Sequence, residues 1–350
     1  MDASLELSAG HPLEPQRLPI GRRTLLLADP ARDGRMLAVE VWYPAAGDAS
    51  ERTTYELIPG VGFRSAGAQH EPPARAGQYP LVLFSHGRTG MRFVAAMVCE
   101  AIAARGAIVL SADHPGDALA DWLLGTHTDD LTNETNRVAD AHFVLDTLLQ
   151  GRPQVPVDIA NAIDRQRIAL AGHSYGAYTA FATAAGSRGV AAHPHVGAIV
   201  AFQGYTRTMS DTLLGRIDVP TLLVVATADA TTPPEIDADR PWALLRTSPV
   251  WRLDIEGAAH QASTDVALYA ELAPRVAFLP DIVRDYLASS GEGTARVGQR
   301  TWREVQLVHV EATWAFLQVT LGIDGDGSAS EGEATADRLQ GAAGLVLRRR

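Results

Sequence analysis

The ten residues from Arg167 to Gly176 constrain the fold of this 350-residue chain more than any other stretch. A short apolar run, 168–171, leads directly into Gly172-His173-Ser174-Tyr175-Gly176, and a segment of small residues, 177–185, follows. The apolar run predicts a buried strand, and the small-residue segment predicts a helix. A serine between two glycines at such a junction is typical of a nucleophile elbow, where glycines leave room for a strained turn. The alternative is an ordinary strand-to-helix turn with Ser174 as a helix cap.

Composition excludes several classes of function. All 30 basic residues are arginine, and the chain contains no lysine. This excludes Schiff-base chemistry, a pyridoxal-phosphate anchor and a Walker P-loop, because each depends on a lysine amine. The net charge of −11 argues against nucleic acid or an anionic membrane as a partner, since either favours a basic surface. The single cysteine, Cys99, cannot form an intrachain disulfide and is expected to be buried in a helix.

The N-terminal residues 1–20 are polar and proline-rich, without the basic and apolar regions of a signal peptide. No window approaches the length and hydropathy of a membrane span. We therefore expect a cytoplasmic protein without an integral membrane segment. Whether it forms a homodimer is left open.

The first part of the chain predicts an extended leader over residues 1–22 and then two strands, 25–28 and 36–43, joined by a turn that contains proline and glycine. Residues 45–78 are rich in Gly, Pro, Ala and Arg and show no sustained period. We interpret them as a long surface excursion.

From residue 79 onward, apolar runs alternate with helical segments. The expected buried strands are 81–84, 107–111, 168–171, 196–202, 221–226 and 250–255. Such alternation predicts an α/β fold with a doubly wound, mostly parallel sheet and helices on both faces. We expect this domain to span residues 23–321, with a small lid insertion at 117–136, and residues 322–350 to form a flexible tail.

Two residues in later loops complete a candidate catalytic set with Ser174. Asp229 follows the strand 221–226, and His260 follows the strand 250–255. A serine needs a base to accept its proton and an acid to orient that base, and the order Ser, Asp, His is the one found with this elbow. Each residue alone also suits a plain loop, Asp229 as a turn or cap residue and His260 at the surface.

An oxyanion formed at Ser174 needs two N–H donors. We expect them from the backbone of Tyr175, at the start of the helix, and of Arg88, in the turn His86-Gly87-Arg88. The alternative for that turn is an ordinary strand-to-helix connection. The residues expected to line the substrate pocket are His86, Gly87, His114, Trp122 and Gln203.

Five motifs together resemble the α/β-hydrolase superfamily: 39–44 (VEVWYP), 84–87 (FSHG), 113–116 (DHPG), 172–176 (GHSYG) and 257–260 (GAAH). Within it, the chain is most similar to the platelet-activating-factor acetylhydrolase-like and predicted dienelactone-hydrolase-like group, over roughly residues 23–321. The acetylhydrolase branch has its acid after the strand that follows the elbow. Here that strand ends in Ala201-Phe202-Gln203-Gly204, without a carboxylate, so Asp229 is the better candidate. Dienelactone hydrolases have a cysteine nucleophile, where this chain has Ser174.

These observations predict a cofactor-independent serine hydrolase that cleaves small-molecule carboxylic esters with short to medium or lipid-like acyl groups. A peptidase or acyltransferase with the same triad is one alternative, and a catalytically silent binding module is another. We expect no metal site, because His193-Pro194-His195 has no third ligand spaced near it and 324–327 is an incomplete calcium loop. No strand is followed by the glycine pattern of a dinucleotide site.

Overall fold

The computed structural model describes residues 18–47, 51–58, 61–276, 279–291, 296–297, 300–323 and 327–350. Its main sheet comprises β1 (Ile20–Asp29), β2 (Arg35–Pro44), β3 (Arg52–Ile58), β4 (Val61–His70), β5 (Tyr79–Ser85), β6 (Ile108–Ala112), β7 (Ile163–His173), β8 (Ala198–Phe202), β9 (Thr221–Ala226), β10 (Val250–Ile255) and β13 (Leu345–Arg349). The helices are α1 (Ala96–Ala104), α2 (Leu119–Leu124), α3 (Asp130–Leu149), α4 (Val157–Ala162), α5 (Tyr175–Ala185), α6 (Asp211–Leu214), α7 (Pro234–Asp237), α8 (Asp239–Leu244), α9 (Val266–Leu272), α10 (Asp281–Gly291), α11 (Trp302–Leu321) and α12 (Ser328–Gln340). Two 3₁₀ turns, Pro30–Arg32 and Ala273–Arg275, and a short pair, β11 (Arg296–Val297) with β12 (Arg300–Thr301), complete the described elements.

The sheet has the strand order β13-β10-β9-β8-β7-β5-β6-β2-β1-β4-β3. The six strands from β6 to β10 in this order pair in parallel, and β2, β3 and β13 pair antiparallel with their neighbours at the two sides of the sheet. This is the predicted doubly wound, mostly parallel architecture. Because parallel strands end on one edge, the loops after β5, β7, β9 and β10 gather at the same end of the molecule.

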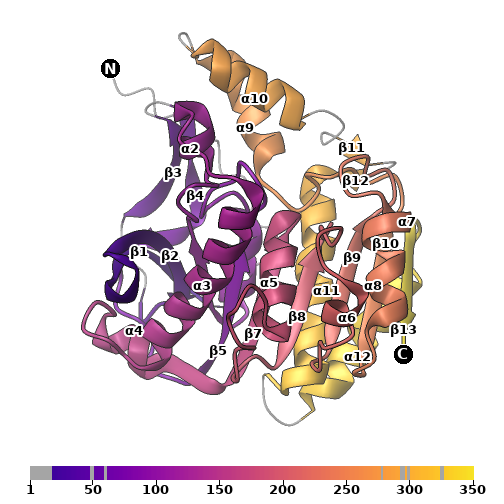
Figure 1. The fold of residues 1–350 in the computed structure, drawn as a ribbon. Coiled ribbons are helices and arrows are strands. Elements are labelled where there is room, and N and C mark those ends of the chain that lie inside the picture. Colours follow the sequence, from indigo (N-terminus) through magenta and orange to yellow (C-terminus); the bar gives the residue numbers. More distant parts are fainter. Residues whose placement is uncertain are drawn as a thin grey trace.

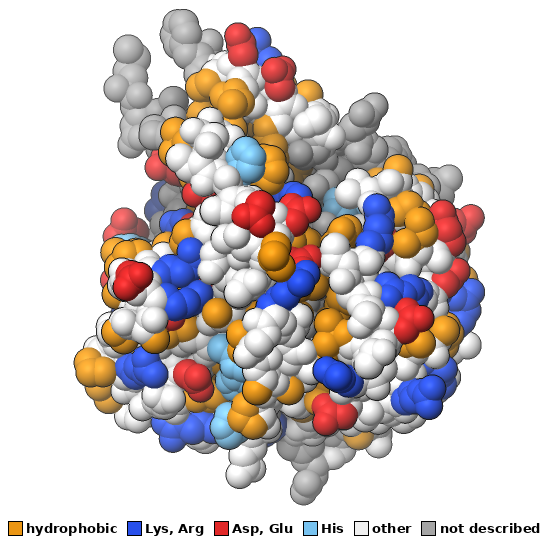
Figure 2. Space-filling view, in the orientation of Figure 1, with side chains coloured by type: hydrophobic (Ala, Val, Ile, Leu, Met, Phe, Trp, Pro, Cys, Tyr) orange, Lys and Arg blue, Asp and Glu red, His pale blue; other side chains and the backbone are white. Residues whose placement is uncertain are grey.

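Helices cover both faces of this sheet, and Figure 1 shows α3 and α5 on the side facing the viewer with α11 behind. Figure 1 also shows α10 projecting from the body at the top of the view. On the face shown in Figure 2, arginine and acidic side chains are interspersed without a continuous basic area. Among the described residues, none of the helices combines the length and the apolar character that crossing a bilayer requires.

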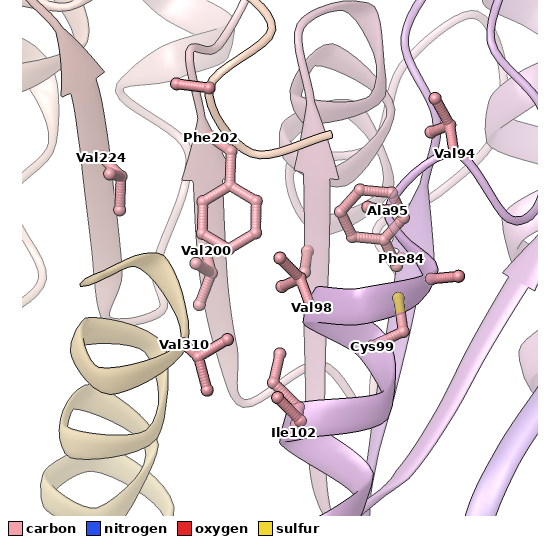
Figure 3. Close-up of a cluster of buried hydrophobic side chains, with 14 of the residues drawn as sticks. Phe84, Val94, Ala95, Val98, Cys99, Ile102, Val200, Phe202, Val224 and Val310 are labelled. Atoms are coloured by element: carbon pink, nitrogen blue, oxygen red, sulfur yellow. The ribbon is translucent and has the colours of Figure 1, made fainter. Parts of the chain in front are cut away.

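Alternate side chains of the central strands point to opposite faces of the sheet and belong to two separate hydrophobic cores. In β5, Val82 and Phe84 belong to one cluster of buried side chains, whereas Leu81 and Leu83 belong to the other. This alternation follows from the two-residue period of a strand, and it favours apolar residues at most positions when both faces are covered. Figure 3 shows the first core, where Phe84 and Phe202 lie among side chains of α1 and α11.

The structure corrects the interpretation of residues 45–78. Within this segment β3 and β4 form an antiparallel pair, and β4 continues in parallel alongside the start of β1. Alternate side chains of the pair, such as Tyr55 and Phe63, are buried against the core. The segment has no regular hydrophobic period in its sequence. Its small residues nevertheless form strands, because each strand pairs with a neighbouring strand of the sheet.

The two ends of the chain also differ from the prediction. Residues 1–17 of the expected leader lie outside the described residues, but β1 begins at Ile20, inside the segment assigned to the leader. The expected flexible tail, 322–350, instead contains α12 and β13. The sheet therefore extends to Arg349, because β13 pairs with β10 and buries Leu345 and Leu347.

Candidate active site

Ser174 lies in the sharp turn between β7 and α5, with φ 55° and ψ −120°. A side chain at either flanking glycine would collide with backbone. A Cβ on Gly172 would lie 2.3 Å from the carbonyl carbon of Gly176, and one on Gly176 would lie 1.9 Å from the carbonyl oxygen of Ser85. The glycines therefore let the turn pack directly against the end of β5, and Ser174 is held in a conformation that serine rarely adopts.

His260 lies next to Ser174, although 86 residues separate them in the chain. The Ser174 hydroxyl lies 2.9 Å from Nε2 of His260. Nδ1 of His260 lies 2.8 Å from a carboxylate oxygen of Asp229. With the proton on Nδ1, the imidazole donates to Asp229 and accepts from Ser174. The three predicted residues thus form one hydrogen-bonded chain at the carboxyl edge of the sheet.

The Asp229 carboxylate is held by several donors besides His260. The backbone N–H groups of Thr231 and Thr232 both donate to Oδ1 at 2.8 Å, and the Thr232 hydroxyl donates to Oδ2 at 2.6 Å. Burial on its own raises the pKa of Asp229, but the hydrogen bonds and charge of His260 and the Thr232 donors leave it lowered. Asp229 is therefore ionised at neutral pH and can stabilise a protonated His260. Thr232 was not predicted; its place three residues after the candidate acid was the available signal.

His173, inside the glycine-flanked motif, holds the loop that carries His260. Its Nε2–H donates to the carbonyl oxygen of His260 at 2.8 Å, and the two rings lie 4.7 Å apart. Burial, followed by the neighbouring His260 ring, lowers the pKa of His173 to about 3. A neutral imidazole here keeps its single donor on the His260 carbonyl and adds no positive charge beside the His260 ring. Sequence reasoning assigned this histidine no role.

The two expected oxyanion donors, Tyr175 and Arg88, lie in backbone segments beside Ser174. Tyr175 is the first residue of α5, so its N–H belongs to the helix N-terminus, where the helix dipole favours negative charge. The turn after β5 lies against the serine, since a Cβ on Gly87 would be 3.1 Å from the Ser174 Cβ. The Arg88 N–H comes from the peptide that follows Gly87.

A small pocket of about 20 Å³ opens beside Ser174. Residues of four segments line it: Gly87, Arg88, Gly90 and Val94 after β5, His173 and Ser174 at the elbow, His260 and Gln261 after β10, and Tyr286 of α10. The Tyr286 hydroxyl donates to the carbonyl oxygen of Thr89 at 3.3 Å. Thus α10, more than 100 residues from the elbow, closes the pocket against the turn after β5.

Comparison with known structures decides the fold. A ferulic acid esterase from Streptomyces cinnamoneus, solved at 2.4 Å resolution, matches this chain with a TM-score of 0.65 and 23% sequence identity. The match covers 89% of this chain and 92% of the esterase. The chain has the α/β-hydrolase fold. The superfamily resemblance of its sequence motifs is therefore confirmed at the level of the fold.

A family model described as chlorophyllase matches residues 70–204, which is less than half of the chain. That segment contains the His86-Gly87 turn and the elbow with Ser174, and it ends before Asp229 and His260. No curated protein sequence matches this chain. The family model therefore concerns only the part of the chain that contains Ser174.

The expected pocket residues need correction. Gly87 lines the pocket, but His86, His114 and Gln203 are at most 3% exposed and lie behind it. His86 accepts from the His114 N–H, and His114 in turn lies 3.1 Å from Asp140. Gln203 bonds to His309 and to Ser263 in the core. These three residues follow strands, which suggested that they line a pocket. The buried turns at strand ends also contain polar groups that need hydrogen-bond partners, and such side chains supply them.

Trp122, in the segment predicted as a lid, lies beside the Arg88 side chain and does not line the pocket. Its indole nitrogen donates to Asp117, and its ring stacks on His127 at 4.0 Å. The Arg88 guanidinium lies 5.9 Å from the Trp122 ring and pairs with Asp130 at 2.7 Å. A lid over 117–136 stays a prediction, whereas α10 is the segment that contacts the pocket beside Ser174. Within the described ranges, no three His, Cys, Asp or Glu side chains are grouped to hold a metal ion.

Proposed function

We propose that the protein is a serine hydrolase that cleaves carboxylic esters through an acyl-enzyme. The observation that carries the proposal is the continuous hydrogen-bonded chain from Ser174 through His260 to Asp229, with links of 2.9 and 2.8 Å. A serine hydroxyl is a weak nucleophile at neutral pH, and such a chain activates it. The esterase with the same fold and the chlorophyllase family model support the same class of reaction.

In the acylation step, the Ser174 oxygen attacks the ester carbonyl carbon while Nε2 of His260 takes the hydroxyl proton. Negative charge develops on the carbonyl oxygen, and the N–H groups of Arg88 and Tyr175 are the donors proposed to bind it. The protonated His260, stabilised by the ionised Asp229, then gives its proton to the leaving alkoxide. The alcohol departs, and the acyl group stays on Ser174.

Deacylation repeats these steps with water. His260 removes a proton from the attacking water, the tetrahedral oxyanion forms again, and its collapse breaks the acyl bond to Ser174. His260 returns the proton to the Ser174 oxygen. The acid product leaves, and the enzyme regains its resting state without any cofactor.

The size of the pocket favours short acyl groups. A cavity of about 10–15 Å³ holds one water molecule, so a pocket of about 20 Å³ has room for little more than one water, and an acetyl group enters only after side chains such as Tyr286 move. We therefore propose short-chain esters as the first substrates to test, with medium and lipid-like chains requiring a larger movement of α10. Cytoplasmic location, the small-molecule partner and the open question of a homodimer stay predictions.

Covalent labelling tests the proposed nucleophile. We expect a fluorophosphonate probe to label the wild-type protein and to leave Ser174→Ala unlabelled, because only an activated serine attacks the phosphorus. Hydrolysis of p-nitrophenyl acetate should disappear in the same variant. Ser330→Ala, at an exposed position on α12, is the matched control and should be labelled like the wild type. A wild-type protein that is not labelled would sink the proposal and favour a binding module.

The same assays separate the roles within the triad. Asp229→Asn should lower kcat by about 10³- to 10⁴-fold while the protein stays folded, because an amide cannot stabilise the His260 imidazolium. Near wild-type kcat in this variant would reject Asp229 as the acid. Parallel p-nitroanilide substrates distinguish a peptidase from an esterase.

A further inference from the structure

Arg137 is a fully buried arginine on α3, with an exposed fraction of 0%. Its Nε donates to the carboxylate of Asp117 at 2.7 Å, and Asp117 is itself only 1% exposed. Burying two charges is unfavourable unless they pair closely and their remaining hydrogen-bonding groups are satisfied. The guanidinium is therefore tied to a single geometry, and the partners of its other nitrogens define what it does.

Those other nitrogens face the turn that follows β5. Nη1 donates to the carbonyl oxygen of His86 at 2.8 Å, and Nη2 donates to that of Gly87 at 3.2 Å. On another side, the guanidinium lies 5.1 Å from the centre of the Tyr175 ring. One buried cation thus contacts the backbone that precedes Arg88 and the side chain of Tyr175, the two residues expected to supply the oxyanion donors.

The hydrogen bond from Arg137 to the Gly87 carbonyl also fixes the direction of the Arg88 N–H. The Gly87 carbonyl and the Arg88 N–H belong to one planar trans peptide, so they point in opposite directions. That carbonyl also accepts from the Gly90 N–H at 3.1 Å and from Nδ1 of His86 at 2.7 Å. Three donors on one side of the peptide direct the Arg88 N–H to the other side, away from Arg137. Arg88 and Gly87 both line the pocket beside Ser174.

A cationic donor also changes the strength of that N–H group. Hydrogen bonds in a low-dielectric interior polarise one another, and bonds from ionised donors are stronger than neutral ones. A guanidinium on the Gly87 carbonyl withdraws electron density from the peptide, which makes the Arg88 N–H a better donor to a developing oxyanion.

We propose that Arg137, held by Asp117, is a positioning residue of the oxyanion hole that orients and polarises the Gly87–Arg88 peptide. The inference rests on the proposed esterase function and adds to it a residue outside the triad. Its effect belongs to the transition state, since the carbonyl oxygen of the bound ester carries much less charge than the tetrahedral oxyanion.

The test uses the full chain with Arg137→Gln and Arg137→Lys, measured with p-nitrophenyl acetate. We expect kcat to fall by about 10- to 100-fold in Arg137→Gln with KM within about twofold of the wild type, as for a lost transition-state interaction. The lysine variant keeps the buried charge, but its single nitrogen cannot take the places of Nε, Nη1 and Nη2 together. Its kcat should therefore lie between those of the wild type and Arg137→Gln.

A pair of inhibitors separates this role from general loosening of the site. An alkyl trifluoromethyl ketone forms a tetrahedral oxyanion on the serine, whereas the corresponding trifluoromethyl secondary alcohol binds without one. The inhibition constant of the ketone should rise in Arg137→Gln by the same factor as kcat/KM falls, and that of the alcohol should not change. The matched control is Arg188→Gln, which removes an arginine paired with buried Glu134 of the same helix and should leave both constants unchanged.

Two outcomes would overturn the inference: wild-type kcat in a folded Arg137 variant, or a reduced kcat with unchanged ketone inhibition. If Arg137→Gln does not fold, Arg137→Lys and Asp117→Asn, which keeps the cation and loosens its anchor, are judged by the same criteria. A wild-type protein that neither hydrolyses esters nor is labelled contradicts the proposed function itself. An active wild type whose folded Arg137 variants are equally active contradicts only the role of Arg137.

Discussion

At the scale of single residues, the clearest feature is that strained and buried groups gather where the chain turns at the sheet edge. Ser174 has a positive φ, and Gln203, which follows the next strand, has a φ of 44°. Such conformations persist only when surrounding contacts determine them. For Ser174, the contacts come from the end of β5, which presses against Gly176. The glycine spacing in the sequence encodes this local geometry, which is why the elbow could be predicted.

A partly buried carboxylate outside the pocket has a shifted pKa. Glu100, on α1, accepts hydrogen bonds from the Tyr55 hydroxyl at 2.6 Å and the Ser65 hydroxyl at 2.8 Å. Burial raises the pKa of Glu100 to about 7, although these two hydrogen bonds act in the opposite direction. In an unfolded chain the pKa of a glutamate is about 4.3. Between the two values the folded protein holds a proton that the unfolded chain has lost, so stability falls as pH rises.

We therefore expect Glu100→Gln to gain stability relative to the wild type as the pH rises from about 4 to about 7. The glutamine does not titrate, so the variant lacks the wild-type loss, which is on the order of 1–3 kcal/mol for a shift of this size. Urea unfolding of both proteins at pH 5 and pH 8 measures the difference. Exposed Glu235→Gln is the control, and an equal difference at both pH values for Glu100→Gln would contradict the expectation.

At the scale of secondary-structure elements, α10 controls the space beside Ser174. Its solvent side carries exposed Ile282 and Asp285, whereas Val283 and Leu287 are buried against the body. Tyr286 is partly exposed and reaches the pocket and the Thr89 carbonyl. The segment predicted as a lid, 117–136, contacts the Arg88 side chain through Trp122 and Asp130. The hydrophobic period of a segment predicts that it is a helix. It does not predict which of several helices contacts the pocket at the edge of the sheet.

Removing the Tyr286 side chain should therefore widen the range of esters. We expect Tyr286→Ala to raise the ratio of kcat/KM for p-nitrophenyl octanoate over p-nitrophenyl acetate by about tenfold or more, since each buried methylene is worth about 0.8 kcal/mol. Asp285→Ala, the neighbouring solvent-facing position, should leave the ratio unchanged. An unchanged ratio in a folded Tyr286→Ala protein would show that α10 does not limit the acyl group.

At the scale of the whole molecule, the last residues of the chain complete the sheet. Strand β13 pairs with β10 along Trp251 to Ile255, and α12 packs on α11, where a Cβ on Gly332 would lie 2.6 Å from the Ala315 carbonyl. The side chains of Leu345 and Leu347 are 5% and 4% exposed, whereas Val346 between them is 50% exposed. The C-terminal segment therefore belongs to the folded domain, and its alternation marks one buried and one solvent face.

This arrangement predicts different effects for two adjacent substitutions. Leu347→Ala should lower the free energy of unfolding by about 2–4 kcal/mol, because it leaves a cavity against the core. Val346→Ala, at the exposed position, should change it by less than about 1 kcal/mol. Urea unfolding measures both. Equal, small effects would mean that residues 345–349 behave as the flexible tail expected from composition.

Prediction from the sequence was most successful where the information is local. The strands 81–84 and 221–226 are almost entirely apolar runs, and such runs are typical where both faces of a strand are covered. It failed for β3, β4, α12 and β13, in which small, polar or charged residues interrupt the apolar ones. These segments become strands or helices because a partner edge or a helix face lies beside them, and that partner is distant in the sequence.

The sequence by itself determined the elbow around Ser174, the order in which Asp229 and His260 follow it, and the alternation of strand and helix that brings all three to one edge of the sheet. Each of these depends on residues a few positions apart, so local sterics and periodicity suffice. Only the tertiary structure decided that His173 holds the loop of His260, that Tyr286 closes the pocket, that Arg137 lies behind the Gly87–Arg88 peptide, and that β13 ends the sheet. Those contacts join segments separated by many residues, and their geometry exists only when the core has packed.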